Sequence, residues 1–253
     1  MRPKTDSEIE AIRKSGSILK QVHDLIAQKL KPGMTGNEID AMARAELKKM
    51  GAKPAFLGVP GGPGVPDFPA TICISLNDAV VHGIPDDTPF KEGDIIGFDF
   101  GVVYDGMITD AARTLIVGNA KSKADEDLVK NTKRSLDEGI NVIKNGARTG
   151  DIGAAVQKVL DENGLGIVRE LVGHGVGHEL HEAPEIPNYG FKGMGSVLKT
   201  GMTIAVEPMA TQGDWRVVVD PDGWTIRSRD GSKSAHFEDT LLITEDGVEI
   251  LTR

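Results

Sequence analysis

The chain has 253 residues, of which 38 are acidic and 29 basic, and its net charge of −9 at pH 7 argues against broad nucleic-acid binding. No stretch approaches the length of an apolar membrane span, and the start of the chain leads into a polar helix rather than an apolar signal core. The single cysteine, Cys73, excludes an internal disulfide and is compatible with the cytoplasm. A chain of this length buries about three quarters of its unfolded surface, so we expect one domain that spans residues 1–253.

The first quarter of the chain predicts two helices and a long connection. The apolar residues of the first helix share one face: Ile9, Ile12, Leu19, Val22 and Ile26. Lys31-Pro32-Gly33 ends this helix, and Thr35 followed by Glu38 is typical of the capping box that begins the next one. The stretch 52–69 is rich in glycine and proline but lacks the Gly-Lys-Ser/Thr ending of a phosphate-binding loop, so it indicates a surface connection or the rim of a site.

Residues 70–81 are strand-like, and a hairpin with two aspartates follows them. Asp105-Gly106 stands between apolar runs, which is a strong signal for a two-residue hairpin turn. If these residues form the turn, Gly101 lies opposite Asp110, and Asp99 lies on the same face as Gly101. The two carboxylates are then a diagonal pair with backbones about 7–8 Å apart. Strands select against aspartate, so this pair favours a functional role.

Helices are predicted again at about 123–144 and 151–162, and a cluster of histidines follows them. The segment 173–182 holds His174, His178 and His181, and such a cluster suggests metal or acid–base chemistry. Its spacings match neither the zincin pattern nor a dinucleotide-binding fingerprint. Spacing alone leaves open which of the three histidines reaches a metal.

The last third of the chain predicts strands, with a turn at Asp222-Gly223. Residues 203–207 alternate between the two faces of a strand that ends at Glu207. We interpret 234–244 as one further strand, in which His236 and Glu238 share a face. A single strand glutamate is as often a solvated residue as a ligand, so the two gain significance only as part of a set.

An internal repeat connects these elements. Lys31, Gly33, Ile39, Ala41, Leu47 and Gly51 recur with the same spacing as Lys144, Gly146, Ile152, Ala154, Leu160 and Gly164. Lys91, Gly93, Ile96 and Asp99 likewise match Lys199, Gly201, Ile204 and Glu207. The chain is therefore interpreted as a duplication with halves at about 1–118 and 119–253, each of which contributes acidic residues to a site where the halves meet.

Five residues together form a candidate metal centre: Asp99, Asp110, His174, Glu207 and Glu238. Each stands in or beside an apolar run, where an isolated charge is costly. Four carboxylates and a neutral imidazole carry a formal charge that two divalent cations would cancel. The set predicts a binuclear metal hydrolase.

Five segments resemble, in the same order, the signature sequences of type I methionine aminopeptidases: Val81-His82-Gly83-Ile84-Pro85, the spacing from Asp99 to Asp110, Gly173-His174-Gly175 with His181-Glu182, Val206-Glu207-Pro208, and Glu238-Asp239-Thr240. The resemblance extends along nearly the whole chain. It implies the α/β (α+β) pita-bread fold, in which two pseudo-symmetric halves surround a central curved antiparallel sheet with outer helices. It also implies removal of the initiator methionine from new proteins and peptides whose second residue is small.

Carried over position by position, the resemblance implies a role for each candidate residue. The metal ligands would be Asp99, Asp110, His174, Glu207 and Glu238, holding two divalent ions for which cobalt, manganese, iron and zinc are all suitable. His82 and His181 match histidines that contact the substrate, Glu207 would also transfer a proton, and His181 would stabilise charge on the scissile carbonyl oxygen. A monovalent cation would bind near Asn77 and Ser234.

The resemblance also implies an apolar pocket sized for a methionine side chain. Cys73, Leu180 and Trp224 align with pocket positions, and Phe56 or Phe68 would complete the wall. The alternative is that these residues belong to the ordinary core.

The sequence departs from the family pattern at His178 and around Glu238, where His236 and Asp239 stand, and the longer loop from Gly58 to Pro69 would reshape the pocket rim. These departures bear on fine specificity and leave the roles of His178 and His236 open.

Two alternative functions were weighed. A proline-specific aminopeptidase or dipeptidase shares the metal set, but such relatives commonly carry an additional N-terminal domain, for which a helix beginning near Ser7 leaves no room. A non-catalytic binding relative is expected to have lost ligands, whereas all five are present. The expected protein is a cytoplasmic monomer that acts on nascent polypeptides, with a transient association with the ribosome as a further option.

Overall fold

The computed structural model describes residues 2–253. The helices are α1 (Asp6–Lys29), α2 (Gly36–Lys49), α3 (Lys123–Asn141) and α4 (Thr149–Glu162). The strands before α3 are β1 (Lys53–Pro54), β2 (Cys73–Leu76), β3 (Ala79–Val81), β4 (Ile95–Tyr104) and β5 (Met107–Ile116). The strands after α4 are β6 (Gly166–Ile167), β7 (Gly173–Gly175), β8 (Glu182–Ile186), β9 (Thr203–Val206), β10 (Met209–Thr211), β11 (Val217–Val219), β12 (Ile226–Ser228), β13 (Ser234–His236), β14 (Asp239–Ile243) and β15 (Val248–Ile250).

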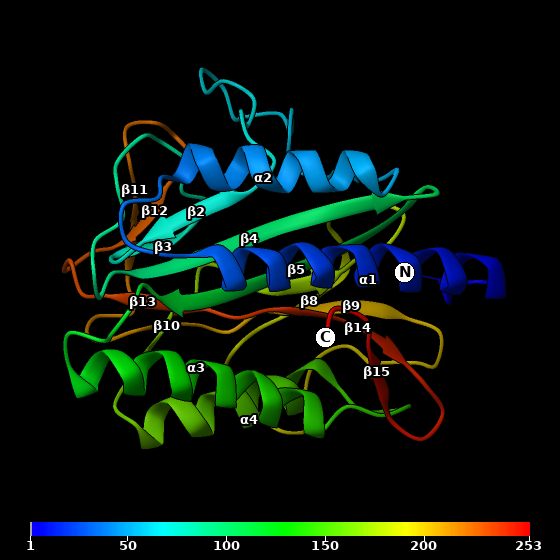
Figure 1. Cartoon of the computed structure of the whole chain (residues 1–253). Coiled ribbons are helices and arrows are strands. Elements are labelled where there is room, and N and C mark those ends of the chain that lie inside the picture. The colour runs from blue at the N-terminus through cyan, green and yellow to red at the C-terminus, as the bar shows by residue number, and fades with distance from the viewer. Residues whose placement is uncertain (1) are drawn as a thin grey trace.

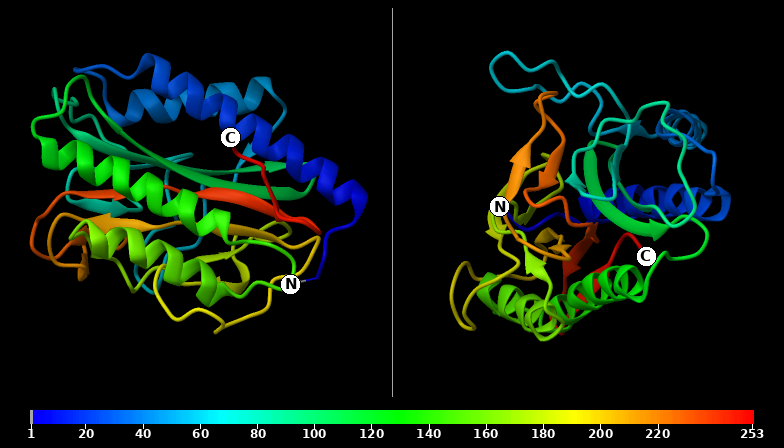
Figure 2. Two further views of the ribbon diagram at one scale, coloured as in Figure 1. Left: turned by 90° about the horizontal axis from the view of Figure 1, so that it is seen from below. Right: turned by 90° about the vertical axis from the view of Figure 1, so that its left-hand side faces the viewer.

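The helices lie in two pairs on either side of the strands, with α1 and α2 on one side and α3 and α4 on the other (Figure 1). In the end-on view of Figure 2 the strands run between the two pairs. One sheet is built on β4, which pairs with β1, β2 and β5, and a second runs in the order β15-β14-β9-β7-β8. Two smaller sheets have the orders β13-β10-β6 and β11-β12-β3. This arrangement of antiparallel strands between outer helices agrees with the predicted α/β architecture.

The two N-terminal helices begin where their sequences predict. Thr5 caps α1 and Thr35 caps α2, and each accepts a hydrogen bond from the backbone of a glutamate three residues later, while Glu8 and Glu38 bond back to the caps. The predicted capping box at Thr35 is therefore confirmed. The apolar face of α1 is buried against β4 and β5, so the helix stabilises the strands that carry the aspartates.

The predicted hairpin is confirmed in its turn and its register. Tyr104 pairs with Met107 and Gly101 with Asp110. Asp105 has φ 47° and Gly106 φ 75°, the positive values that a two-residue turn of this kind requires.

Two predicted strands are wrong in their extent. The interval 234–244 is two strands, because the chain leaves β13 at His236 and re-enters a different sheet at Asp239. The interval 70–81 is likewise divided, since Asn77 has φ 55° and turns the chain between β2 and β3. At the first break His236 and Glu238 stand two residues apart, as they would in one continuous strand, so their spacing alone could not reveal it.

Backbone hydrogen bonds in the second half copy those in the first. In the first half, Gly33 N donates to Phe90 O at 2.8 Å and Gly93 N donates to Val117 O at 2.7 Å. In the second half, Gly146 N donates to Leu198 O at 2.9 Å and Gly201 N donates to Ile243 O at 2.8 Å. All four glycines have φ between 73° and 90°, a conformation that favours glycine. The repeated glycines of the sequence thus make equivalent turns.

The core is divided between the two sides of the strands. One apolar cluster lies between α1, α2 and the sheet of β4, and another lies between α3, α4 and strands β9 and β14. Within residues 2–253, no helix has the length and apolar character needed to cross a membrane.

Candidate metal centre and substrate pocket

The aspartate pair lies on the paired strands β4 and β5. Asp99 of β4 is opposite Cys73 of β2. Asp110 of β5 is opposite Gly101 of β4. Both carboxyl groups are buried. The backbone of Asp110 is also joined to β14, because its N–H donates to Thr240 Oγ1 at 2.9 Å and its carbonyl accepts from the same hydroxyl at 2.7 Å.

The two glutamates stand at the breaks between strands rather than within them. Glu207 follows β9, and Glu238 precedes β14, whose first residue pairs with Val206. The buried amide of Asn188 donates from Nδ2 to the backbone carbonyl of Glu207 at 3.0 Å. The breaks therefore turn both side chains toward the aspartate pair.

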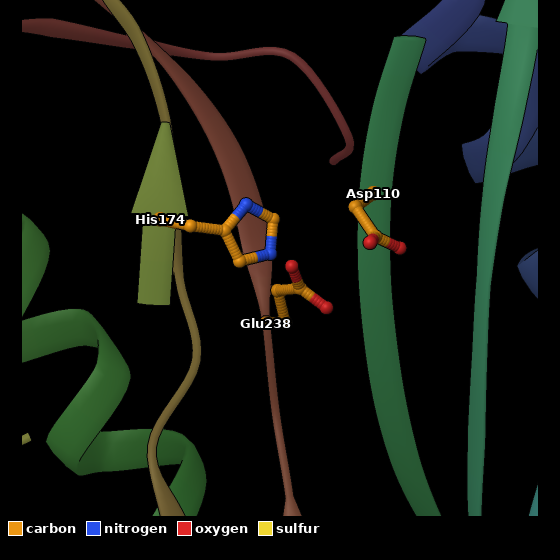
Figure 3. A group of neighbouring side chains, drawn as sticks. All are labelled: Asp110, His174 and Glu238. Atoms are coloured by element: carbon orange, nitrogen blue, oxygen red, sulfur yellow. The ribbon is translucent and has the colours of Figure 1, made fainter. Parts of the chain in front are cut away.

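The structure answers which histidine joins the acidic residues. His174 on β7 lies with Asp110 and Glu238, and one ligand atom from each of the three lies within 4.8 Å of the others (Figure 3). Nδ1 of His174 lies 2.9 Å from the Gly175 carbonyl oxygen, which can only accept, so Nδ1 carries the proton. The unprotonated Nε2 then faces the cluster, 3.4 Å from Oε1 of Glu207. This is the tautomer that a metal-ligating histidine uses.

Across residues 2–253, no lysine or arginine forms an ion pair with the four carboxylates of this cluster, whose nearby basic partners are histidines. Burial raises the pKa of Asp110 to about 7, and it also raises the pKa of Asp99, Glu207 and Glu238 well above the usual range. Repulsion from Asp110 adds to the shift at the latter three. Within the described residues, Oδ1 of Asp99, Oδ1 of Asp110 and Oε1 of Glu238 are buried without a hydrogen-bond partner. Buried acceptors of this kind, with one imidazole, fit divalent cations.

Two further histidines border the cluster. His82 has φ 58°, which directs its side chain from the turn after β3 into the cavity. The His181 ring packs edge-on against His174, with centroids 4.4 Å apart. Burial lowers the pKa of His82 to about 4 and lowers that of His181, so both imidazoles are neutral near pH 7.

The predicted pocket residues all line one cavity of about 100 Å³ beside the cluster. Its apolar wall consists of Phe56, Val59, Phe68, Cys73, Leu180 and Trp224. The same cavity is lined by His82, His181 and all five candidate ligands. The Trp224 ring packs edge-on against Phe68 at 5.2 Å, and its Nε1 donates to the carbonyl oxygen of Pro66 at 2.8 Å. The loop 58–69 thus forms the rim, as the sequence suggested.

Val59 was missed because a valine in a glycine-rich loop carries no periodic signal. Asn188 and Thr240 were missed for another reason: they bind the backbone of the candidate ligands Glu207 and Asp110, which no pattern in the sequence connects with them. His236 and His178, whose roles were left open, are resolved differently. His236 is buried beside the cluster, with Nε2 3.6 Å from Oε2 of Glu207, whereas His178 lies away from the cluster and contacts Glu8.

Asn77 and Ser234, expected near a monovalent cation, are neighbours. Ser234 donates to the Asn77 carbonyl from its backbone N at 2.9 Å and from Oγ at 3.2 Å.

Buried carboxylates that converge with a neutral imidazole, beside an apolar cavity in a fold of this kind, define a metal-dependent hydrolase. The model of metallopeptidase family M24 matches residues 10–245, and the chain belongs to that family. Its members use divalent metal ions, which accords with the donor set described above.

Relatives across nearly the full length carry one functional name. The methionine aminopeptidase of Clostridium perfringens is 43% identical over 249 residues, covering 98% of this chain and 97% of the relative. Methionine aminopeptidase 1 of Bacillus subtilis is 42% identical over 250 residues, covering 99% and 98%.

Solved structures agree with these relatives. The methionine aminopeptidase of Thermotoga maritima superimposes with a TM-score of 0.95 at 45% identity, covering 100% of this chain and 99% of that one. A prolidase from Pyrococcus furiosus superimposes with a TM-score of 0.77 at 26% identity. The match covers 99% of this chain and 65% of the prolidase chain. The predicted resemblance to methionine aminopeptidases and the predicted pita-bread fold are therefore confirmed.

Proposed function

We propose that this protein is a metal-dependent methionine aminopeptidase, which hydrolyses the N-terminal methionine from nascent proteins and peptides. The observation that carries the proposal is the cavity itself, in which an apolar wall and five metal-ligand candidates face one another. An unbranched, polarizable side chain suits an irregular pocket with aromatic walls. The cavity, of about 100 Å³, would take one methionine side chain, and the preferred substrates would have a small second residue.

Asp99, Asp110, His174, Glu207 and Glu238 would hold two divalent metal ions, with cobalt, manganese, iron or zinc as suitable identities. When bound, such ions supply Lewis acidity and lower the pKa of a coordinated water. The raised pKa values of the four carboxyls support this assignment, because burial, with repulsion from Asp110 at the other three, makes their negative charges costly without cations.

The protein side chains would complete the reaction. Glu207 takes a proton from the attacking water and delivers it to the leaving amine. His82 and His181 hold the substrate, and His181 donates a hydrogen bond to the carbonyl oxygen as negative charge develops on it. Their lowered pKa values support neutral imidazoles, each of which has one N–H to donate.

Cys73 and Trp224 would contact the substrate side chain, with Phe56, Phe68 and Leu180 completing the wall. The hydrogen bond from Trp224 to Pro66 supports this role, because it fixes the indole against the rim. Asn77 and Ser234 would contribute to a monovalent-cation site, which their adjacency supports.

We further propose that residues 1–253 form one catalytic domain with duplicated halves at about 1–118 and 119–253. The equivalent glycine turns support the duplication. The protein would act as a cytoplasmic monomer, without nucleic-acid specificity, on chains that leave the ribosome, with which a transient association would bring it to its substrates.

The test compares the peptides Met-Ala-Ser and Ala-Pro with protein that has been stripped of metal and then reloaded with cobalt or manganese. We expect metal-dependent release of methionine from the first peptide and no cleavage of the second. Glu207→Gln should abolish release, whereas Arg13→Met, which removes a surface ion pair with Glu249, should not. Cleavage of Ala-Pro instead would assign the protein to the prolidase type, and cleavage of neither peptide would favour a binding role.

A further inference from the structure

The loop 176–181 between β7 and β8 carries two residues of the proposed site, Leu180 in the pocket wall and His181 beside His174. Among residues 2–253, no side-chain hydrogen bond orients His181 (the nearest defined contact of its ring is the packing against His174). The position of the imidazole therefore depends on the backbone of this loop. Whatever fixes that backbone also sets the geometry of the proposed reaction.

The carboxylate of Glu182, next to His181, fixes the loop from within. Oε1 of Glu182 accepts hydrogen bonds from the backbone N–H of His178 at 2.7 Å and of Glu179 at 3.2 Å. Only 13% of the Glu182 side chain is exposed, so its charge is poorly solvated.

Lys4, from the segment before α1, supplies the compensating charge. Its side chain is completely buried, and Nζ lies 3.3 Å from Oε2 and 3.4 Å from Oε1 of Glu182. Nζ also lies 3.2 Å from Nδ1 of His178. A cation on the N-terminal segment thus contacts both ends of the loop segment 178–182.

The chain is built to admit this lysine. Gly177 has φ 147°, and an added Cβ there would lie 2.4 Å from Lys4 Cε. The backbone N–H of Lys4 donates to the Gly201 carbonyl at 2.8 Å, and an added Cβ on Gly201 would lie 2.9 Å from Pro3 Cβ. Two glycines of the second half therefore make room for the segment.

An outer layer of charges anchors the same segment to the loop. His178 Nε2 lies 2.8 Å from Oε1 of Glu8, and Glu8 is the residue that completes the capping box of α1. Arg2 pairs with Glu8 from outside. The start of α1 and the His181 loop are thereby joined by two sets of contacts. The contact between Lys4 and Glu182 is buried, whereas the contact between Glu8 and His178 is partly exposed.

We propose that Lys4 is a positioning residue for the proposed aminopeptidase reaction: its buried ammonium group holds Glu182 and so sets the loop that places His181. The inference rests on the proposed function for its effect on catalysis, but the ordering of the loop stands independently. Lys4 is not among the residues that line the cavity, so it acts through the loop, by its contacts with Glu182 and His178.

The test uses Lys4→Met, which keeps the length of the side chain but removes its charge, in the full-length, metal-loaded protein. We expect kcat for Met-Ala-Ser to fall about 10- to 100-fold, the loss that small misplacements of a catalytic group produce, with a smaller change in KM. Amide hydrogen exchange at residues 178 and 179 should accelerate, because their acceptor is no longer held. The matched control, Arg13→Met, removes the ion pair between α1 and Glu249 and should leave kcat and exchange in the loop unchanged.

A second variant separates positioning from general stability. In Lys4→Met/Glu182→Gln the side chain at position 182 is a neutral amide whose oxygen still accepts the two backbone hydrogen bonds, so kcat and slow exchange should partly recover. Wild-type kcat in Lys4→Met, or a loss of kcat with unchanged exchange in the loop and no rescue, would overturn the proposal. If the wild type itself fails to cleave Met-Ala-Ser, the proposed function fails, whereas the exchange measurement still decides whether Lys4 orders the loop.

Discussion

The two halves of the molecule present their acidic residues in different ways. In the first half, β4 and β5 are continuous ten-residue strands, and the aspartates lie within them. In the second half, the equivalent ladder is interrupted: β9 pairs with β14 and β10 pairs with β13, while Glu207 and Glu238 occupy the breaks between these pairs. A short aspartate side chain needs a strand that runs close to the proposed centre, whereas the longer glutamate side chain extends to the same cavity from an irregular backbone. The first half therefore contributes short side chains on rigid strands, and the second half contributes longer side chains from the interruptions between strands.

The largest expected effect comes from removing a ligand on the rigid half. Asp110→Asn should lower activity by more than about 100-fold, because even the loss of a group that hydrogen-bonds to a metal ligand costs about 10- to 100-fold. In chelator, the same variant should be more stable than the wild type by at least about 1 kcal/mol, the equivalent of one unit of raised pKa, because burial opposes the charge of Asp110.

Activity assays and thermal unfolding in chelator measure the two effects. Asp105→Asn, in the exposed turn of the same hairpin, is the control and should change neither. If the metal-free Asp110→Asn protein is instead less stable than the metal-free wild type, the buried charge of Asp110 does not destabilise the fold.

The rigidity of the hairpin can be tested at a glycine. Gly101→Ala places a Cβ 2.8 Å from Ala55 Cβ and 3.2 Å from Phe56 Cε1, and overpacking of this kind costs about 1–3 kcal/mol. Because Phe56 lines the pocket, KM for methionine peptides should also rise. Gly97→Ala in the same strand is the matched control, since its nearest contact would be at 3.5 Å. Equal denaturation midpoints for the two variants would contradict this account.

The last prediction concerns α1, the helix that covers β4 and β5 in the first half, and depends on pH. His23 of α1 is buried, and Nε2 lies 3.0 Å from the Ala111 carbonyl. Burial lowers the pKa of His23 to about 3 from the ordinary value of 6.5, so the unfolded chain takes up a proton before the folded one does. The stabilisation is complete above pH 6.5 and is lost as pH falls toward 3, by about 1.4 kcal/mol per pH unit.

His23→Leu should remove this slope while costing a constant amount for the lost hydrogen bond. Urea unfolding of both proteins between pH 4 and 7 measures the difference. Parallel curves for wild type and variant over this range would rule out the buried neutral histidine as the source of the slope.

The contrast between the halves also explains what the sequence could predict. The hairpin register followed from Asp105-Gly106, because a two-residue turn leaves only one alignment of its strands. The break between His236 and Asp239 was hidden, since the side-chain alternation continues across a change of partner strand. Spacing could not select His174 as the candidate ligand, because its place depends on β9, which lies between β7 and β14 in the sheet, and on the contact of β14 with β5. Lys4 gave no signal, since its partner Glu182 is 178 positions away.

The aromatic cavity carries a consequence for damaged substrates. Phe68 and Trp224 form its wall, and the indole N–H is already committed to Pro66. Oxidation of a thioether adds a polar oxygen, to which the aromatic part of the wall offers no hydrogen-bond donor. A nascent chain whose first side chain has become a sulfoxide should therefore keep that residue until a reductase repairs it, so that maturation of the N-terminus reports on oxidative stress in the cell.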